Sequence, residues 1–150
     1  MTEYIKNHNI LLFSETRLQK IPPSKFPGYD IFSLKQKTPY HGLALLIKNG
    51  IFSFTKKLTA TSPCVLWVLL GSSECKINFI LGSVYIPGYN SKFSDENDFD
   101  KINEDVLALR EKHNCPFILM GDFNSRTGNI SDSLGDELNP PTPRQNMDKK

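Results

Sequence analysis

Short apolar runs, rather than long helical stretches, constrain the fold of this 150-residue chain most strongly. Each run is rich in branched or aromatic residues and is bounded by Gly, Pro, Asn or Ser, a pattern typical of β-strands. The sequences Asn49-Gly50 and Gly71-Ser72-Ser73-Glu74 separate neighbouring runs and predict hairpins. A series of hairpin-linked strands suits one layer of a β-sandwich. The expected strands cover residues 9–13, 29–33, 42–48, 51–54, 65–70, 77–86 and 116–120.

One amphipathic helix is expected over residues 98–113, where apolar residues recur at three- and four-residue steps. Ser94 or Asp95 can cap its start, and the acidic residues near that end suit the helix dipole. We expect the helix to cover a sheet face, to leave its charges in solvent and to carry no chemistry. The predicted apolar stripe consists of Phe99, Ile102, Val106 and Leu109.

Polar residues follow the last expected strand, 116–120, in the sequence Gly121-Asp122-Phe123-Asn124. The apolar residues 116–120 predict a buried strand that ends at Gly121. Asp122 and Asn124 then project from the carboxyl end of this strand, while Phe123 packs on the core. A carboxylate beside an amide can orient a water molecule and donate a hydrogen bond to a phosphoryl oxygen. The same residue types are also ordinary turn formers, so a structural turn is the alternative interpretation.

Two further candidates stand at strand ends. Glu15 follows the strand at 9–13, where its carboxylate can ligate a hard divalent cation. Taken alone, Glu15 is more simply interpreted as an acid on the surface or near a helix N-cap. Tyr85 lies near the end of the strand at 77–86, where its hydroxyl can reach a phosphate. The alternative for Tyr85 is a core tyrosine whose hydroxyl finds a local partner.

In their order along the chain, these motifs resemble the endonuclease/exonuclease/phosphatase superfamily. Within it, they resemble the endonuclease domains of non-LTR (LINE-like) retrotransposons. The resemblance runs from about residue 1 to about residue 150, and residues 125–128 extend it in the retroelement branch. The matching segments are 14–18, 41–47, 83–87 and 119–124.

The resemblance implies an α/β (α+β) fold that is a partial four-layer sandwich. In such a fold, two mostly antiparallel β-sheets lie face to face and are flanked by helices. It also implies hydrolysis of phosphate esters with Mg²⁺ (or Mn²⁺), and DNA as the partner of the complete domain. It assigns Glu15 to the metal and Tyr85 to the phosphate. It further assigns Asp122 to the nucleophilic water and Asn124 to stabilising the developing charge.

The chain departs from the family pattern at both ends. No asparagine motif precedes the glutamate strand, and no Ser-Asp-His triplet follows the Gly-Asp-Phe-Asn motif. We therefore expect residues 1–150 to form an incomplete domain, with about 1–128 ordered and 129–150 loosely ordered. The favoured interpretation is a fragment of a retroelement endonuclease. The alternatives are a non-catalytic remnant or pseudogene product, and a phosphatase- or sphingomyelinase-like relative.

Composition adds few constraints. The net charge is only +2, and the excess of lysine and arginine in residues 1–57 suits either phosphate contacts or a solvated face. Cys64, Cys75 and Cys115 lack metal-ligand spacing and favour a reducing compartment. No segment approaches the roughly 18 apolar residues of a membrane span, and the start does not resemble a signal peptide. We therefore expect an intracellular protein, cytoplasmic or nuclear.

Overall fold

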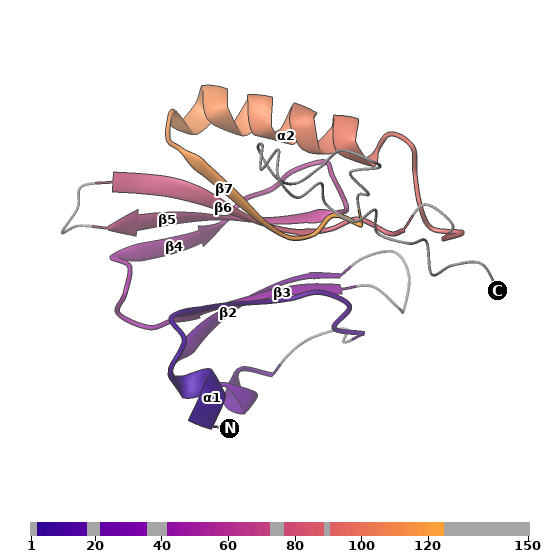
Figure 1. Ribbon diagram of the computed structural model, residues 1–150. Coiled ribbons are helices and arrows are strands. Elements are labelled where there is room, and N and C mark those ends of the chain that lie inside the picture. The colour runs from indigo at the N-terminus through magenta and orange to yellow at the C-terminus, as the bar shows by residue number, and fades with distance from the viewer. Residues whose placement is uncertain (1–2, 18–21, 36–41, 73–76, 89–90, 125–150) are drawn as a thin grey trace, which may run out of the picture.

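Two β-sheets stacked face to face form the body of the molecule, and one long helix lies on the outer face of one sheet (Figure 1). The computed structural model describes residues 3–17, 22–35, 42–72, 77–88 and 91–124. The α+β sandwich expected from the sequence is therefore confirmed. The predicted loosely ordered tail at 129–150 and Cys75 lie outside the described residues.

The first sheet has three antiparallel strands in the order β1-β3-β2. Its central strand pairs on both sides, and every residue of that strand except Lys48 is buried. A short helix and a 3-10 turn lie on the outer side of this sheet (Figure 1). These elements are α1 (Glu3–Lys6), β1 (Ile10–Phe13), η1 (Pro23–Lys25), β2 (Tyr29–Lys35) and β3 (Gly42–Lys48).

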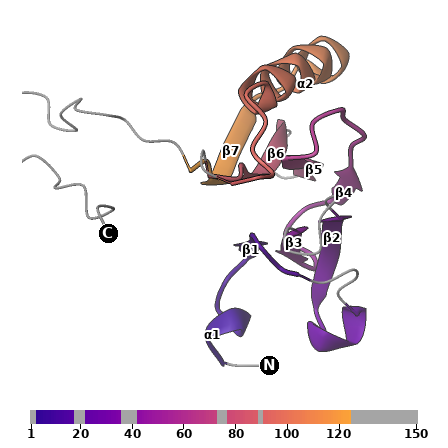
Figure 2. The same cartoon turned by 90° about the vertical axis from the view of Figure 1, so that its right-hand side faces the viewer.

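The second sheet has four strands in the order β4-β5-β6-β7. The first three are antiparallel, whereas β7 pairs in parallel with β6 because helix α2 carries the chain back across the sheet between them. Viewed from the side, β1 and β7 lie toward one edge of the sandwich and β2 and β4 toward the other (Figure 2). The elements are β4 (Phe54–Lys57), β5 (Val65–Ser72), β6 (Ile77–Tyr85), α2 (Asp98–His113) and β7 (Phe117–Asp122).

The side chains of β5 point alternately to the two faces of the sheet and contribute to two separate hydrophobic cores. Val65 and Trp67 pack beneath α2, whereas Leu66, Val68 and Leu70 face the three-stranded sheet. Successive side chains of a strand point to opposite faces, so a fully apolar strand must be covered on both sides. This explains why the central strands lack the polar alternation of a half-exposed sheet.

The hairpin predicted at Asn49-Gly50 is wrong. The chain leaves β3 there and crosses to the other sheet, where β4 begins at Phe54 and pairs with β5. The backbone N–H of Ser53 already donates to the carbonyl of Gly71 at 2.8 Å. Because β1 and β2 occupy both edges of β3, no edge remains for the segment that follows the turn. The antiparallel pairing predicted between the next two strands, now β5 and β6, is confirmed.

Helix α2 has the predicted bounds, but several details differ. Its N-cap residue is Asn97, with no side-chain cap, and Asp95 instead accepts the Asn97 backbone N–H at 2.9 Å. Phe99 is 51% exposed, although the stripe predicts burial. Asp98 and Asp105 are buried, so the prediction that all charges of the helix face solvent is also wrong.

The last strand was expected to be buried and to end at Gly121, and both expectations are wrong. It continues through Gly121 to Asp122, and Ile118 and Met120 are about half exposed because β7 is an edge strand. Phe117, Leu119 and the following Phe123 pack on the core beneath α2, as expected for Phe123.

None of the described helices is long and apolar enough to cross a membrane.

Candidate active site

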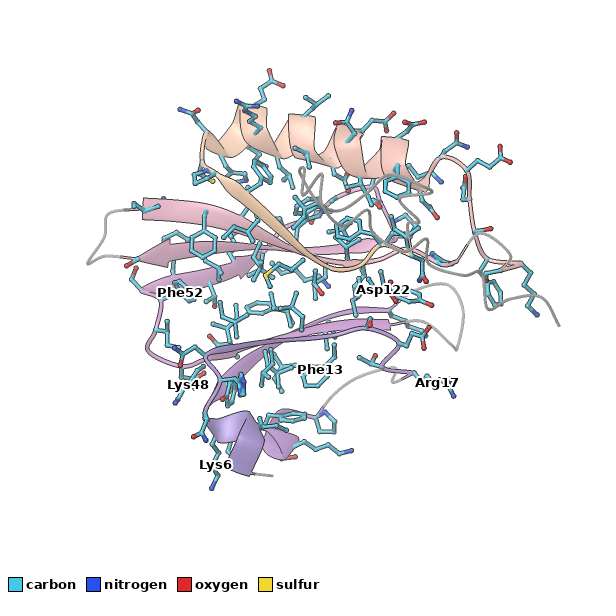
Figure 3. All side chains as sticks on the ribbon, viewed as in Figure 1. Lys6, Phe13, Arg17, Lys48, Phe52 and Asp122 are labelled. Atoms are coloured by element: carbon cyan, nitrogen blue, oxygen red, sulfur yellow. The ribbon has the colours of Figure 1, made fainter. Side chains whose placement is uncertain are left out.

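The loop after β1 and the ends of β6 and β7 meet at one end of the sandwich. In the parallel register of β6 and β7, Tyr85 stands directly opposite Asp122. Figure 3 shows Asp122 at the end of the molecule that also holds Arg17, away from Lys48 and Phe52. Residues from three distant parts of the sequence therefore come together here.

Glu15 is the residue that the first loop contributes. The Tyr85 hydroxyl donates a hydrogen bond to Glu15 Oε1 across 70 positions of sequence. Glu15 and Arg17 both have left-handed backbone conformations, with φ of 49° and 53°, and Thr16 between them donates its N–H to the Gly42 carbonyl at 3.1 Å. Such a conformation costs a non-glycine residue roughly 1–2 kcal/mol. Local strain of this kind is common where a loop must present a functional side chain.

Tyr85 is buried to 5% exposure, and its ring belongs to the core between the sheets. Burial raises the pKa of Tyr85 to about 12, helped by the hydrogen bond to Glu15 and by the negative charges of Glu15 and Asp122. At neutral pH the hydroxyl is therefore protonated and acts as a donor. Tyr85 is therefore a core tyrosine whose hydroxyl has a partner, and that partner is Glu15, the candidate metal ligand. Its contact with a phosphate stays a prediction.

Two hydrogen bonds tie the end of β7 to Ile86, which follows β6, and a third closes the turn after β7. Ile86 donates its N–H to the Asp122 carbonyl at 3.0 Å, and Asn124 Nδ2 donates to the Ile86 carbonyl at 2.8 Å. Asp122 Oδ1 accepts the Asn124 backbone N–H at 3.0 Å, while Asn124 has a left-handed φ of 45°. The Asp122 side chain therefore closes a turn with the backbone of Asn124, and this hydrogen bond fixes the Asp122 carboxylate in place.

Gly121 permits the close approach of the two strands. It has φ of 145°, and a Cβ atom there would lie 2.0 Å from the Val84 carbonyl oxygen. Because any side chain would push β7 away from β6, glycine is needed for Asp122 to stand opposite Tyr85.

The two acids suit a divalent cation. Glu15 and Asp122 are both exposed and both raise the pKa of the Tyr85 hydroxyl, and among the described residues no ion pair is found for either acid. Within the described ranges, the salt bridge found joins Lys101 and Asp95 instead. No cluster of three or more His, Cys, Asp or Glu occurs in that part of the chain. Two carboxylates fit Mg²⁺ nonetheless, because this ion keeps several water ligands.

Sequence reasoning missed two features, one in the core beneath α2 and one beside the site. Asp105 lies between Ile102 and Leu109 on the buried face of α2, and this position inside an apolar stripe is a readable signal. Its carboxylate accepts hydrogen bonds from the segment before β5. The second feature is a pocket of about 990 Å³ beside Asn124, lined partly by Phe99. No motif in the sequence marks that pocket.

The whole chain was compared with known proteins. Residues 1–144 match the model of the Endonuclease/Exonuclease/phosphatase family. A search of curated protein sequences found no match.

Similar solved structures exist at low identity. The human Nocturnin catalytic domain with bound sulfate anion has a TM-score of 0.61 and 13% identity, over 82% of this chain and 54% of that one. The AP endonuclease LMAP from Leishmania major has a TM-score of 0.63 and 14% identity, over 87% of this chain and 51% of that one. These likenesses show a shared fold, and the chain spans about half the length of both structures.

Proposed function

Because the chain belongs to the Endonuclease/Exonuclease/phosphatase family, we propose that its site hydrolyses phosphodiester bonds of DNA with the help of a divalent metal ion. The observation that carries the proposal is the meeting of Glu15, Tyr85 and Asp122 at one end of the sandwich. The similar fold of an AP endonuclease supports DNA as the substrate class. The sequence matches at residues 14–18 and 122–128 favour the LINE-like retroelement branch within the family.

Each side chain has a definable task in this reaction. Glu15 would hold the cation, which when bound would supply positive charge beside the phosphate. Asp122 uses one carboxylate oxygen to hold the Asn124 N–H, so its second oxygen can accept a proton from the attacking water. Asp122 thereby orients that water for in-line attack on phosphorus.

Two donors complete the site. The Tyr85 hydroxyl remains protonated, because its pKa is about 12, and it would donate to a phosphate oxygen in place of Glu15 Oε1. Asn124 Nδ2 uses one N–H on the Ile86 carbonyl, which leaves its second N–H for a phosphoryl oxygen. Fixed donors of this kind stabilise charge that develops in the transition state.

Nicking of supercoiled plasmid DNA by the 150-residue chain tests the proposal. With Mg²⁺ we expect nicking that Asp122→Ala lowers by about 100-fold or more, the usual effect of removing a general base. Glu15→Gln should raise the Mg²⁺ concentration needed for half-maximal nicking. Asp100→Ala is the matched control, because Asp100 is an exposed aspartate on α2 outside the site.

Two results would contradict the proposal. Equal nicking by the Asp122→Ala and Asp100→Ala variants would show that the cleavage does not use this site. Absence of Mg²⁺-dependent nicking by the unaltered chain would favour the second candidate, a non-catalytic remnant of the domain.

A further inference from the structure

A pocket of about 990 Å³ opens beside the candidate active site, between the segment after β6 and the first turn of α2. Asn124 forms part of its wall, two residues beyond Asp122. The volume is at the upper end of the range for small-molecule sites. The lining mixes apolar and polar side chains, among them Pro87, Ser91, Glu96, Phe99, Phe123 and Asn124.

The charge of the pocket disfavours a phosphate group. Among the described residues, its lining includes the acids Asp95 and Glu96 and no lysine or arginine. Asp95 is already engaged, with Lys101 Nζ at 2.5 Å and the Asn97 N–H at 2.9 Å. Glu96 is exposed, and among the described residues no hydrogen bond or ion pair is found for it. Its carboxylate is therefore available to accept hydrogen bonds from a neutral ligand with N–H groups.

Phe99 supplies an aromatic surface in the same pocket. Ile102 and Leu109 of the same apolar stripe are 6% exposed, but Phe99 is 51% exposed and lines the pocket instead of the core. A half-exposed phenylalanine beside a hydrogen-bond acceptor matches the two needs of a nucleobase, which are a stacking partner and a group that reads its edge.

We propose that this pocket binds a nucleobase next to the phosphodiester bond that is cleaved, an inference that rests on the proposed function. The base stacks on Phe99 and donates its exocyclic amino group to Glu96. Cytosine carries such a group, whereas thymine presents carbonyl oxygens on both sides of its one N–H. The pocket therefore prefers cytosine to thymine, because carbonyl oxygens facing the Glu96 carboxylate are repelled.

Binding of short single-stranded oligonucleotides to the full 150-residue chain tests this inference. Fluorescein-labelled oligo-dC and oligo-dT of equal length are titrated in EDTA and followed by anisotropy, so that no cleavage intervenes. Oligo-dC should bind about tenfold more tightly than oligo-dT. Glu96→Ala should remove this preference, whereas Glu104→Ala, the control for an exposed glutamate on α2, should keep it.

Phe99→Ala should weaken binding of both oligonucleotides about tenfold, as expected from the loss of one base–aromatic stack. Leu107→Ala is the control, because Leu107 is a similarly exposed apolar residue of α2 that does not line the pocket. Equal effects of the two substitutions, or no measurable binding by the unaltered chain, would overturn the pocket assignment.

The two proposals can fail separately. Plasmid nicking that depends on Asp122, combined with oligonucleotide binding that ignores Phe99 and Glu96, would leave the proposed function standing and remove the pocket. Binding that depends on Phe99 and Glu96 without any metal-dependent nicking would keep the base pocket and remove the hydrolytic function.

Discussion

Replacing Asp105 with alanine should destabilise the fold more than almost any other change to a polar residue. Asp105 lies on the inner face of α2, is 4% exposed and joins the helix to the segment that leads into β5. Its Oδ1 accepts the Thr61 N–H at 2.8 Å and the Thr61 hydroxyl at 2.7 Å. Its Oδ2 accepts the Ser62 N–H at 3.0 Å and the Trp67 indole N–H at 3.2 Å.

The size of the loss in unfolding free energy depends on which hydrogen-bond donors lose their acceptor. Ser62 and Trp67 are 4% and 1% exposed, so their N–H groups cannot turn to water, and each orphaned donor costs about 1–3 kcal/mol. Thr61 is exposed and can hydrate. Two such donors amount to about 2–6 kcal/mol, and the lower half of this range applies because removing a buried carboxylate with no ion pair in the described part of the chain also recovers part of its desolvation cost. The net loss is about 3 kcal/mol, a large share of the roughly 5–15 kcal/mol that stabilises a typical domain.

Urea unfolding followed by circular dichroism measures this loss. The midpoint should fall strongly in Asp105→Ala with an unchanged slope, whereas Glu104→Ala, next to it but exposed, should change the free energy of unfolding by less than about 0.5 kcal/mol. The emission of Trp67, which is the only tryptophan in the chain, should also shift, because its indole loses an acceptor. A loss below about 1 kcal/mol would refute the reasoning that the buried donors depend on this carboxylate.

Two further predictions concern the strands that carry the site. Gly121→Ala should cost about 3 kcal/mol, from left-handed strain and from the clash with the Val84 carbonyl, whereas Gly50→Ala, with φ of 83° and open space around it, should cost about 1 kcal/mol. Equal midpoints for the two variants in urea would contradict the close-approach argument. Tyr85 has its pKa raised from 10.0 to about 12, so the stability it contributes is complete below pH 10 and is lost as the pH rises to 12. Between pH 10 and pH 12, Tyr85 should make the free energy of unfolding fall with rising pH, by up to about 1.4 kcal/mol per pH unit. Tyr85→Phe should remove this part of the pH dependence, and an unchanged pH dependence would contradict the raised pKa.

Local patterns predicted most elements of the fold. The three- and four-residue spacing of Ile102, Val106 and Leu109 marked the helix, and short apolar runs marked the strands. Phe99 departs from its stripe because it lines the pocket beside Asn124 instead of packing in the core beneath α2. The turn at Asn49-Gly50 was misread because a turn sequence specifies a local bend, and the hairpin also requires an open strand edge.

Polar residues near strand ends identified the candidate site, because Glu15, Asp122 and Asn124 follow apolar runs close to the ends of β1 and β7. The sequence did not predict the hydrogen bond between Tyr85 and Glu15, the pairing of β7 with β6, or the pocket at Phe99. These depend on contacts between distant segments, which form only when two sheets and a helix bury their apolar faces together.

The sequence by itself determined which residues can enter strands and the helix, and which polar side chains stand at their ends, because hydrophobic periodicity acts over a few neighbouring residues. Only the tertiary structure decided which strands pair and that Tyr85 lies opposite Asp122. It also decided that Asp105 is buried, where it holds four donors. The reason is physical: burial and strand pairing are properties of the whole packed chain, and their free energy is absent from any local stretch of sequence.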